Sequence, residues 1–458
     1  MEGVYWVSMK SVYIETLGCP KNEVDSDHMV GFLQNNHFSC VHQPESAEII
    51  IVNTCSFIEE ASAESIERIL SLSEYKQTGK CKKIIVTGCL VQRYASDIKK
   101  ELTEVDAFLG TGAFDQIVEI ARQVNTPSSI YTPCPEKTSA WFENIPRSFN
   151  SDTKTVYIRI AEGCSLHCTY CIIPKLRGPY RSRPFENIIK EFNFFLDVGA
   201  KEIVLVAQDT AAYGMDLSSS VRLSDLVVKM GDIIEQREIS TRIRVLYMNP
   251  QHIDDRLIDT FKTVKALCPY IDMPIQHSND EILKHMGRPY TQQILRQLIK
   301  KIRTTIPEIV LRTTLLVGFP GEKELHFQEL LNFICDIQFD HLGVFDYSDE
   351  DDLPSHRLKE HVSDEEKEDR RHRLMIAQAE ISYDRQQRFI GKEYQVLTEN
   401  LSDDDPPLRE GRTYFQAPEI DGLTLISGKP VSSGIFCQVR IVSAMHYDLI
   451  GEVCETTA

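Results

Sequence analysis

Residues Glu162–Pro184 read EGCSLHCTYCIIPKLRGPYRSRP and hold three cysteines in one short segment. Cys164, Cys168 and Cys171, here called the second cysteine trio, are spaced Cys-x3-Cys-x2-Cys. Soft thiolates favour zinc or an iron–sulfur cluster, and a structural zinc site normally takes four protein ligands. Because the next cysteine is Cys268, the trio better fits a 4Fe-4S cluster that leaves one iron open to S-adenosylmethionine (SAM). A zinc loop or a group of buried thiols is the alternative.

The residues around the second cysteine trio extend this interpretation. Tyr170 is the aromatic residue just before the third cysteine, and we expect it to stack on the adenine side of SAM. A basic run follows, formed by Lys175, Arg177, Arg181 and Arg183. Such a run is usually a solvated surface, although beside an anionic cofactor it can equally well bind carboxylates.

The composition limits the class of protein and of partner. The chain has 458 residues and a formal charge of -18, from 50 Lys and Arg against 68 Asp and Glu. An acidic chain repels phosphate backbones and attracts basic partners. Thirteen cysteines are scattered through it without an apparent signal peptide, which favours a reducing cytoplasm and metal-bound thiolates over a disulfide scaffold. No run of apolar residues is long enough to span a membrane.

Residues 10–135 alternate apolar runs with helical patterns, which predicts a parallel α/β domain. Its first three predicted strands each end near a cysteine: Cys19 in ETLGCPKN, Cys55 in VNTCSF and Cys89 in VTGCLVQ. Because the carboxyl ends of parallel strands form one edge, these residues, here called the first cysteine trio, should meet there, each near a helix N-terminus. The alternative interpretation is that these three are ordinary buried cysteines, which are common in protein cores.

The central part of the chain predicts a barrel. Residues 124–154 have scattered Pro, Ser and Thr with little periodicity, and we expect a linker at 136–152. Residues 153–380 carry six apolar runs that alternate with amphipathic stretches, which predicts a partial (β/α)6 barrel. The second cysteine trio follows the first of these strands, at the carboxyl face where such barrels keep their chemistry.

Other predicted strand ends on that face offer cofactor contacts. Gln208 and Asp209 follow the second strand and could bind ribose hydroxyls or the SAM amine. Gly318 and Gly321 follow the fifth strand, where glycine lets a backbone approach an adenine ring. His277 follows the fourth strand, and a lone histidine of this kind is more often structural.

The last part of the chain has a different residue pattern. Residues 388–457 predict short strands separated by turns, which indicates a small antiparallel β-barrel. Small barrels often bind nucleic acid through basic and aromatic residues. From Arg388 onward, however, there are six Lys or Arg and eleven Asp or Glu. This excess of acid disfavours phosphate contacts and favours a basic protein partner.

Taken in order, the two cysteine trios and the final barrel resemble the radical-SAM methylthiotransferase family over nearly the whole chain, the barrel being that family's TRAM domain. LGCPKNEVDSD around Cys19 and GRTYFQAPEIDG at Gly411–Gly422 are most similar to its RimO branch, which methylthiolates the β-carbon of an aspartate in ribosomal protein S-twelve. The sequence departs from that branch at YSDEDDLPSH, Tyr347–His356.

The resemblance implies two 4Fe-4S clusters, one on each cysteine trio, with SAM bound at the second. SAM would serve as radical source and as methyl donor. It further implies an electron donor such as flavodoxin or ferredoxin, and a sulfur donor. Two other functions stay open, a tRNA adenosine methylthiotransferase of the MiaB type and a non-catalytic metal-binding adaptor for RNA or the ribosome.

Overall fold

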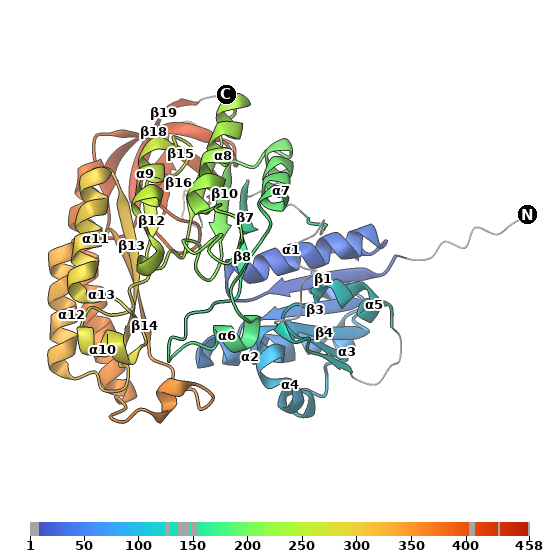
Figure 1. Ribbon diagram of the computed structural model, residues 1–458. Helices are drawn as coiled ribbons and strands as arrows, with labels where there is room; N and C mark the ends of the chain where they lie inside the picture. Colours follow the sequence, from blue (N-terminus) through green and yellow to red (C-terminus); the bar gives the residue numbers. More distant parts are fainter. Residues whose placement is uncertain are drawn as a thin grey trace, which may run out of the picture. The chain divides into compact units, whose positions relative to one another are not determined.

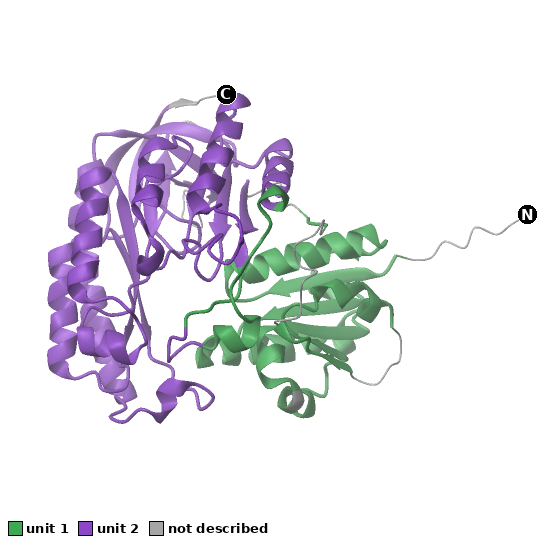
Figure 2. Ribbon diagram, in the orientation of Figure 1, with its two compact units in different colours: residues 1–149, 162–166, 172–187 green, residues 150–161, 167–171, 188–458 purple. Residues whose placement is uncertain are grey.

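The computed structural model describes residues 9–123, 129–135, 146–148, 154–402, 408–428 and 431–456. The chain forms two compact units (Figure 2). The first unit is residues 1–149, 162–166 and 172–187, and the second is residues 150–161, 167–171 and 188–458. The predicted linker, 136–152, lies outside the described residues except for 146–148. No helix among the described residues is long and apolar enough to cross a membrane.

The first unit is built on one six-stranded parallel sheet in the order β2-β1-β3-β4-β5-β6 (Figure 1). Its strands are β1 (Ser11–Thr16), β2 (Ser39–Cys40), β3 (Ile49–Thr54), β4 (Lys83–Gly88), β5 (Ala107–Leu109) and β6 (Ser129–Tyr131). Its helices are α1 (Pro20–Asn35), α2 (Glu59–Ser73), α3 (Tyr75–Thr78), α4 (Cys89–Glu101), α5 (Ile117–Arg122) and α6 (Ile173–Arg177). The predicted parallel α/β fold is therefore confirmed here.

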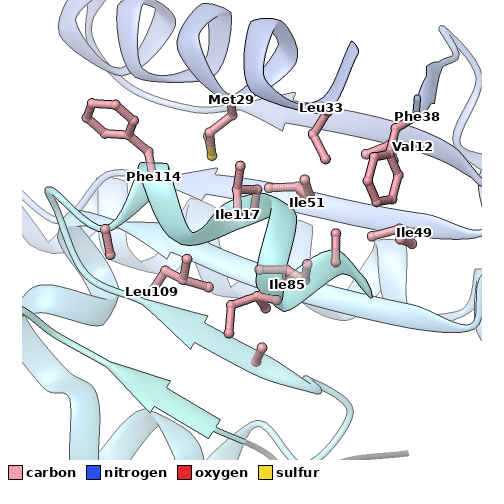
Figure 3. Packing of buried hydrophobic residues seen from close by; sticks show 14 residues of the cluster. Val12, Met29, Leu33, Phe38, Ile49, Ile51, Ile85, Leu109, Phe114 and Ile117 are labelled. Atoms are coloured by element: carbon pink, nitrogen blue, oxygen red, sulfur yellow. The ribbon is translucent and has the colours of Figure 1, made fainter. Parts of the chain in front are cut away.

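Apolar side chains on both faces hold this sheet in place. Every residue of β3, IIIVNT, is buried, as expected for a central parallel strand covered on both sides. On one face, Ile49 and Ile51 pack with Met29 and Leu33 of α1 and with Ile117 of α5 (Figure 3). A second cluster covers the opposite face. The sheet is thus fixed by burial, and its carboxyl edge has a defined geometry.

The second unit contains the six strands predicted for the barrel, but their hydrogen bonding is divided. They form two three-stranded parallel sheets, in the orders β11-β10-β7 and β12-β13-β14. Their bounds are β7 (Thr155–Arg159), β10 (Glu202–Val206), β11 (Arg242–Val245), β12 (Tyr270–Asp272), β13 (Val310–Val317) and β14 (His341–Asp346). Isolated bonds, such as Met248 N to Asp272 O at 2.9 Å, connect the two halves.

Amphipathic helices alternate with these strands. They are α7 (Phe185–Asp197), α8 (Leu223–Gln236), α9 (Asp255–Thr263), α10 (Asp280–His285), α11 (Gln292–Thr305), α12 (Glu324–Ile337) and α13 (Asp364–Gln386). The last of them begins where the sequence suggests, because the Ser363 hydroxyl caps the Glu366 N–H at 3.3 Å. α13 packs along β14 and α12.

The C-terminal strands close into a five-stranded barrel in the order β15-β16-β17-β19-β18. They are β15 (Glu393–Leu401), β16 (Arg409–Arg412), β17 (Thr424–Ser427), β18 (Phe436–Ala444) and β19 (Leu449–Thr456). The barrel departs from a purely antiparallel one in a single pairing, because β17 runs parallel to β19. Along the chain, β18 lies between these two strands and runs antiparallel to β19, so β17 and β19 point in the same direction.

A buried ion cluster fastens this barrel to the central sheet. The Glu202 carboxylate is fully buried and pairs with Arg242 at 3.0 Å, Arg244 at 2.7 Å and Arg412 at 2.7 Å. Burial opposes its ionisation, but the three guanidinium groups outweigh that cost and hold the pKa of Glu202 well below its usual value. Since Arg412 belongs to β16, this ion cluster links the barrel to the sheet.

Candidate metal centres

The first cysteine trio lies on the carboxyl edge of the first unit's sheet. β1, β3 and β4 are neighbours in that sheet, and the trio follows their ends. Cys19 is the N-cap of α1 and Cys89 is the first residue of α4. Cys55 follows β3 directly, whereas α2 begins only at Glu59, so the expectation of a helix N-terminus beside every cysteine was wrong for Cys55.

The backbone brings these thiols close together. Gly18 has φ +91°, and a Cβ on it would lie only 2.6 Å from the Cβ of Cys55, so a side chain there would displace Cys55. Burial raises the pKa of Cys55 to about 12, with further contributions from the thiols of Cys89 and Cys19. The three thiols therefore lie close enough to interact, with Cys89 buried and Cys19 and Cys55 half-buried.

A single metal ion and a 4Fe-4S cluster require different spacings of the three thiols. Among the described residues, no three His, Cys, Asp or Glu side chains could hold one metal ion. Sulfurs on one tetrahedral zinc would stand about 3.8 Å apart, given its bond length. A 4Fe-4S cluster binds each thiolate to a different iron, so its cysteines stand farther apart. That the first cysteine trio holds such a cluster stays a prediction from these residues and their place at the strand ends.

A buried arginine completes this site. Arg177 is 1% exposed, and its Nη2 lies 3.7 Å from the sulfur of Cys89 and 2.9 Å from Asn22 Oδ1. Its Nη1 reaches the carboxylates of Glu162 at 3.3 Å and Asp25 at 3.4 Å. Burial disfavours its charge, but the Glu162 carboxylate and its neighbours outweigh that and raise the pKa of Arg177 further above its ordinary value.

Each of the two interpretations of the basic run holds for part of it. Arg177 is not part of a solvated surface, and the carboxylates it binds belong to the protein itself. Lys175 is exposed, as the other interpretation required. The sequence offered one unused signal, since Asn22 and Asp25 lie in the same LGCPKNEVDSD segment as Cys19.

The structure describes the second cysteine trio in two parts. Cys164 belongs to the first unit, where its N–H donates to Gly178 O at 3.0 Å. The adjacent Gly163 has φ +76°, and a Cβ on it would lie 2.2 Å from Pro179 O. In the second unit, Cys171 N donates to Cys168 O at 3.1 Å, which forms a tight turn. Their convergence on one cluster stays a prediction from their spacing.

Tyr170 is fixed by its neighbours in the second unit. Its hydroxyl accepts hydrogen bonds from the Arg288 guanidinium at 2.5 and 3.1 Å. Its ring meets Phe319 edge to face, with centroids 6.4 Å apart, and Phe319 in turn packs against Tyr347 at 5.4 Å. The ring is therefore held at the carboxyl ends of β13 and β14, and its stacking on SAM stays a prediction.

The other predicted cofactor residues lie at the same ends of the strands. Asp209 is buried, and its carboxylate contacts His252 Nδ1 at 2.6 Å and accepts the Asn249 N–H at 3.2 Å. Gln208, next to it, is half-buried. Asp209 is thus already oriented by protein groups.

The glycines after β13 also have structural partners. Gly318 N and Phe319 N donate to one carboxylate oxygen of Glu322, at 2.5 and 3.2 Å. A Cβ on Gly318 would lie 2.2 Å from Lys367 Cγ, so packing against α13 requires glycine there. Gly321 has φ +87° and more open surroundings, its nearest neighbour to a Cβ being His285 Nδ1 at 3.8 Å. The predicted roles of these residues toward adenine remain predictions.

The loop that departs from the family pattern supports the second trio. Ser355 N donates to Thr169 O at 3.0 Å, between Cys168 and Cys171. The Tyr347 hydroxyl donates to Ser355 Oγ at 2.9 Å, and this hydrogen bond joins the two ends of the loop. The sequence Tyr347–His356 therefore braces the cysteine turn from within the second unit.

Three family models match the chain. They are described as "Uncharacterized protein family UPF0004" over residues 11–110, "Radical SAM superfamily" over 158–334 and "TRAM domain" over 390–454. These segments carry the first trio, the second trio and the closed barrel, in that order.

Curated relatives match over almost their whole length. A protein of Desulforamulus reducens named ribosomal protein uS12 methylthiotransferase RimO is 42% identical, over 98% of this chain and all of the relative. A protein of the same name from Clostridioides difficile is 43% identical, over 97% of this chain and 99% of the relative. Among solved structures, the radical SAM methyltransferase TsrM of Kitasatospora setae, with cobalamin and a [4Fe-4S] cluster bound, has a TM-score of 0.56. The match covers 74% of this chain and 75% of the TsrM chain at 12% sequence identity, so it supports the fold alone.

Proposed function

We propose that this chain, which belongs to the family of ribosomal protein uS12 methylthiotransferases named RimO, is an enzyme that methylthiolates the β-carbon of an aspartate in ribosomal protein uS12. The observation that carries the proposal is the likeness to those enzymes, 42–43% identity over at least 97% of the chain. Such coverage includes both cysteine trios and the barrel.

The reaction requires cofactor chemistry, because a β C–H beside a carboxylate is not acidic enough for a side-chain base. When bound, the cluster on Cys164, Cys168 and Cys171 supplies the electron that generates a radical from SAM, and that on Cys19, Cys55 and Cys89 carries the sulfur to be methylated by SAM. Within this proposal, the chain's own residues bind and orient these groups.

The positioning roles follow from the contacts. We assign Arg177 the task of fixing Cys89, because its guanidinium is itself held by Glu162, Asp25 and Asn22. A buried cation beside this thiolate also offsets the negative charge that three thiolates bring into a partly buried site. In the second unit, Tyr170 presents a fixed ring, and Asp209, Gln208, Gly318 and Gly321 remain the proposed SAM contacts.

The domain boundaries and partners are part of the same proposal. We place the methylthiotransferase domain at 10–135, the linker at 136–152, the radical-SAM core at 153–380 and the TRAM-like barrel at 388–457. The reaction consumes electrons and sulfur, so it needs a one-electron donor such as flavodoxin or ferredoxin and a separate sulfur donor. Since ribosomes are assembled in the cytoplasm, we place the enzyme there.

The deciding experiment compares cells with and without this gene. The intact mass of uS12 and the modified nucleosides of tRNA are measured from the same cultures. We expect a methylthio increment on uS12 that disappears on deletion, while the tRNA is unchanged. An unchanged uS12 together with a missing methylthio-nucleoside would replace the proposal by the tRNA activity. No change in either, with no SAM cleavage by the anaerobically reconstituted protein, would favour the adaptor.

A further inference from the structure

The sheet β12-β13-β14 ends in an open edge. β13 pairs with one side of β14, and no strand in the described ranges pairs with the other. The Tyr347 N–H donates to Val317 O of β13 at 2.8 Å. Because N–H directions alternate along a strand, the N–H groups of Leu342 and Val344 point away from β13. β14 therefore offers backbone donors to an additional strand.

A large cavity runs along this edge. It has a volume of about 980 Å³, and we call it the β14 groove. Four consecutive β14 residues, 341–344, form one side. Residues of one α13 face, Glu365, Glu368, His372 and Met375, form another, and the barrel closes it with 420–422 and Tyr447. An extended segment of about four residues fits the length of this strand edge, at roughly 3.3 Å per residue.

The groove is acidic. Glu365 and Glu368 are exposed and make no ion pair within the described part of the chain, whereas Arg371 is paired with Asp346 at 3.3 Å. At the end of the groove where β14 begins, Arg312 pairs with Asp272 at 3.1 Å. The charges that stay uncompensated are therefore negative.

A buried carboxylate, that of Asp421, lines the end of the groove where β14 begins. Asp421 is 1% exposed on its side chain, and its Oδ2 accepts hydrogen bonds from the Tyr270 hydroxyl and the Ala417 N–H. Its Oδ1 accepts no hydrogen bond from the residues that the structure describes, although Arg312 Nε lies at 3.5 Å and His341 Nδ1 at 3.6 Å. A buried acceptor without a donor at the lining of a cavity is suited to a ligand N–H.

We propose that the β14 groove is the docking site for an extended, basic segment of the protein substrate, which adds to β14 as a further strand. This inference rests on the proposed function, because a ribosomal protein must bind RNA phosphates and is accordingly rich in Lys and Arg. Main-chain hydrogen bonds to Leu342 and Val344 give affinity, as in other strand additions. Every second side chain of the segment then faces Glu365 and Glu368.

Two observations connect this groove with substrate choice. Residues 420–422 belong to GRTYFQAPEIDG, one of the two segments by which the sequence resembles the RimO branch. The strand beside the groove also leads to Tyr347, which packs on Phe319 and thereby on Tyr170. A segment bound along β14 is thus directed toward the carboxyl ends of the strands.

The backbone part of the proposal is tested with Val344→Pro. Proline removes the outward N–H and leaves the bonds to β13, since an edge strand tolerates proline at such a position. The matched control Val344→Ala shortens the side chain and keeps the N–H. Binding of purified uS12 to the reconstituted protein is measured by calorimetry, with SAM cleavage and cluster content as checks of folding. We expect about tenfold weaker binding for Val344→Pro and near-normal binding for Val344→Ala.

The charge part is tested with the double variant Glu365→Gln/Glu368→Gln, which changes only exposed side chains. Glu380→Gln, also exposed on α13 but outside the groove, is the control. We expect severalfold weaker binding of uS12 at low salt for the double variant, and a difference that vanishes in high salt because the ions screen these charges. The control should match the unmodified protein throughout.

A second probe separates this inference from the proposed function. It is a synthetic peptide of alternating Lys and Val, given to the same variants. If uS12 is a substrate yet both groove variants bind it and the peptide normally, the groove proposal is overturned while the function stands. If uS12 neither binds nor reacts but the peptide binding is weakened by Val344→Pro, the groove stands and the substrate assignment falls.

Discussion

The two cysteine trios are assembled in opposite ways. Cys19, Cys55 and Cys89 follow three different strands and meet only because β1, β3 and β4 are adjacent in one sheet. Cys164, Cys168 and Cys171 lie in one loop, so the covalent chain alone keeps them near one another. The first site therefore depends on the packing of a whole unit, whereas the second is kept together by the chain itself and braced by a few distant contacts such as Ser355 N to Thr169 O. Four predictions test this difference, in order of decreasing effect.

The largest effect is expected from removing the cysteines themselves. Cys55→Ala and Cys168→Ala should each abolish methylthiolation of uS12 and lose about half of the reconstituted iron, as expected for one of two 4Fe-4S clusters. Only Cys168→Ala should also lose SAM cleavage, measured as 5′-deoxyadenosine. Cys335→Ala, an exposed cysteine outside both trios, should keep both activities. Methylthiolation by either trio variant would refute the assignment.

The next effect concerns the buried arginine of the first site. Arg177→Met should lower the free energy of unfolding by about 3–5 kcal/mol, because it leaves the carboxylates of Glu162 and Asp25 buried without their cation. Denaturant titration of the apoprotein measures this change. The neighbouring Lys175→Met, at an exposed position, should stay within about 0.5 kcal/mol. Equal stability of the two variants would contradict the buried network.

Glycine substitutions separate the two sites more finely. Gly18→Ala and Gly163→Ala each combine a positive φ with a Cβ closer than 3.0 Å to another atom, and should cost at least about 2 kcal/mol. Gly18→Ala should deplete iron at the first trio and spare SAM cleavage, while Gly163→Ala should impair SAM cleavage. Gly199→Ala has φ +87° with open surroundings, so it isolates the cost of the backbone conformation. If the first two variants behave like this control, the close contacts are not decisive.

The smallest effect is expected at Tyr170. Tyr170→Phe keeps the ring contact with Phe319 but removes the acceptor of the two Arg288 hydrogen bonds, which should cost about 1–2 kcal/mol of stability. If the ring stacks on SAM, the affinity for SAM should change little, whereas Tyr170→Ala should weaken it strongly. Calorimetry with SAM compares the two variants, and equal affinities would exclude the stacking role.

Much of the fold follows from local patterns. The apolar runs around Ile49–Val52 and Ile84–Val86 predict the strands that are found, because central parallel strands need continuous burial. The division of the barrel strands into two sheets was not predictable, since hydrogen-bond continuity depends on how β11 and β12 pack. The parallel pairing of β17 with β19 likewise depends on the path of the chain through the closed barrel.

The sequence by itself determined the chemistry of this protein. Ligand type and spacing are local properties, so the second cysteine trio, the three strand-end cysteines and the acidic tail could all be recognised in the printed chain. Only the tertiary structure decided that Arg177 lies against Cys89 and that Asp421 and β14 line one cavity. Both features bring together residues that lie far apart in the chain. Their proximity arises because folding buries apolar surface, and the local spacing of residues does not predict it.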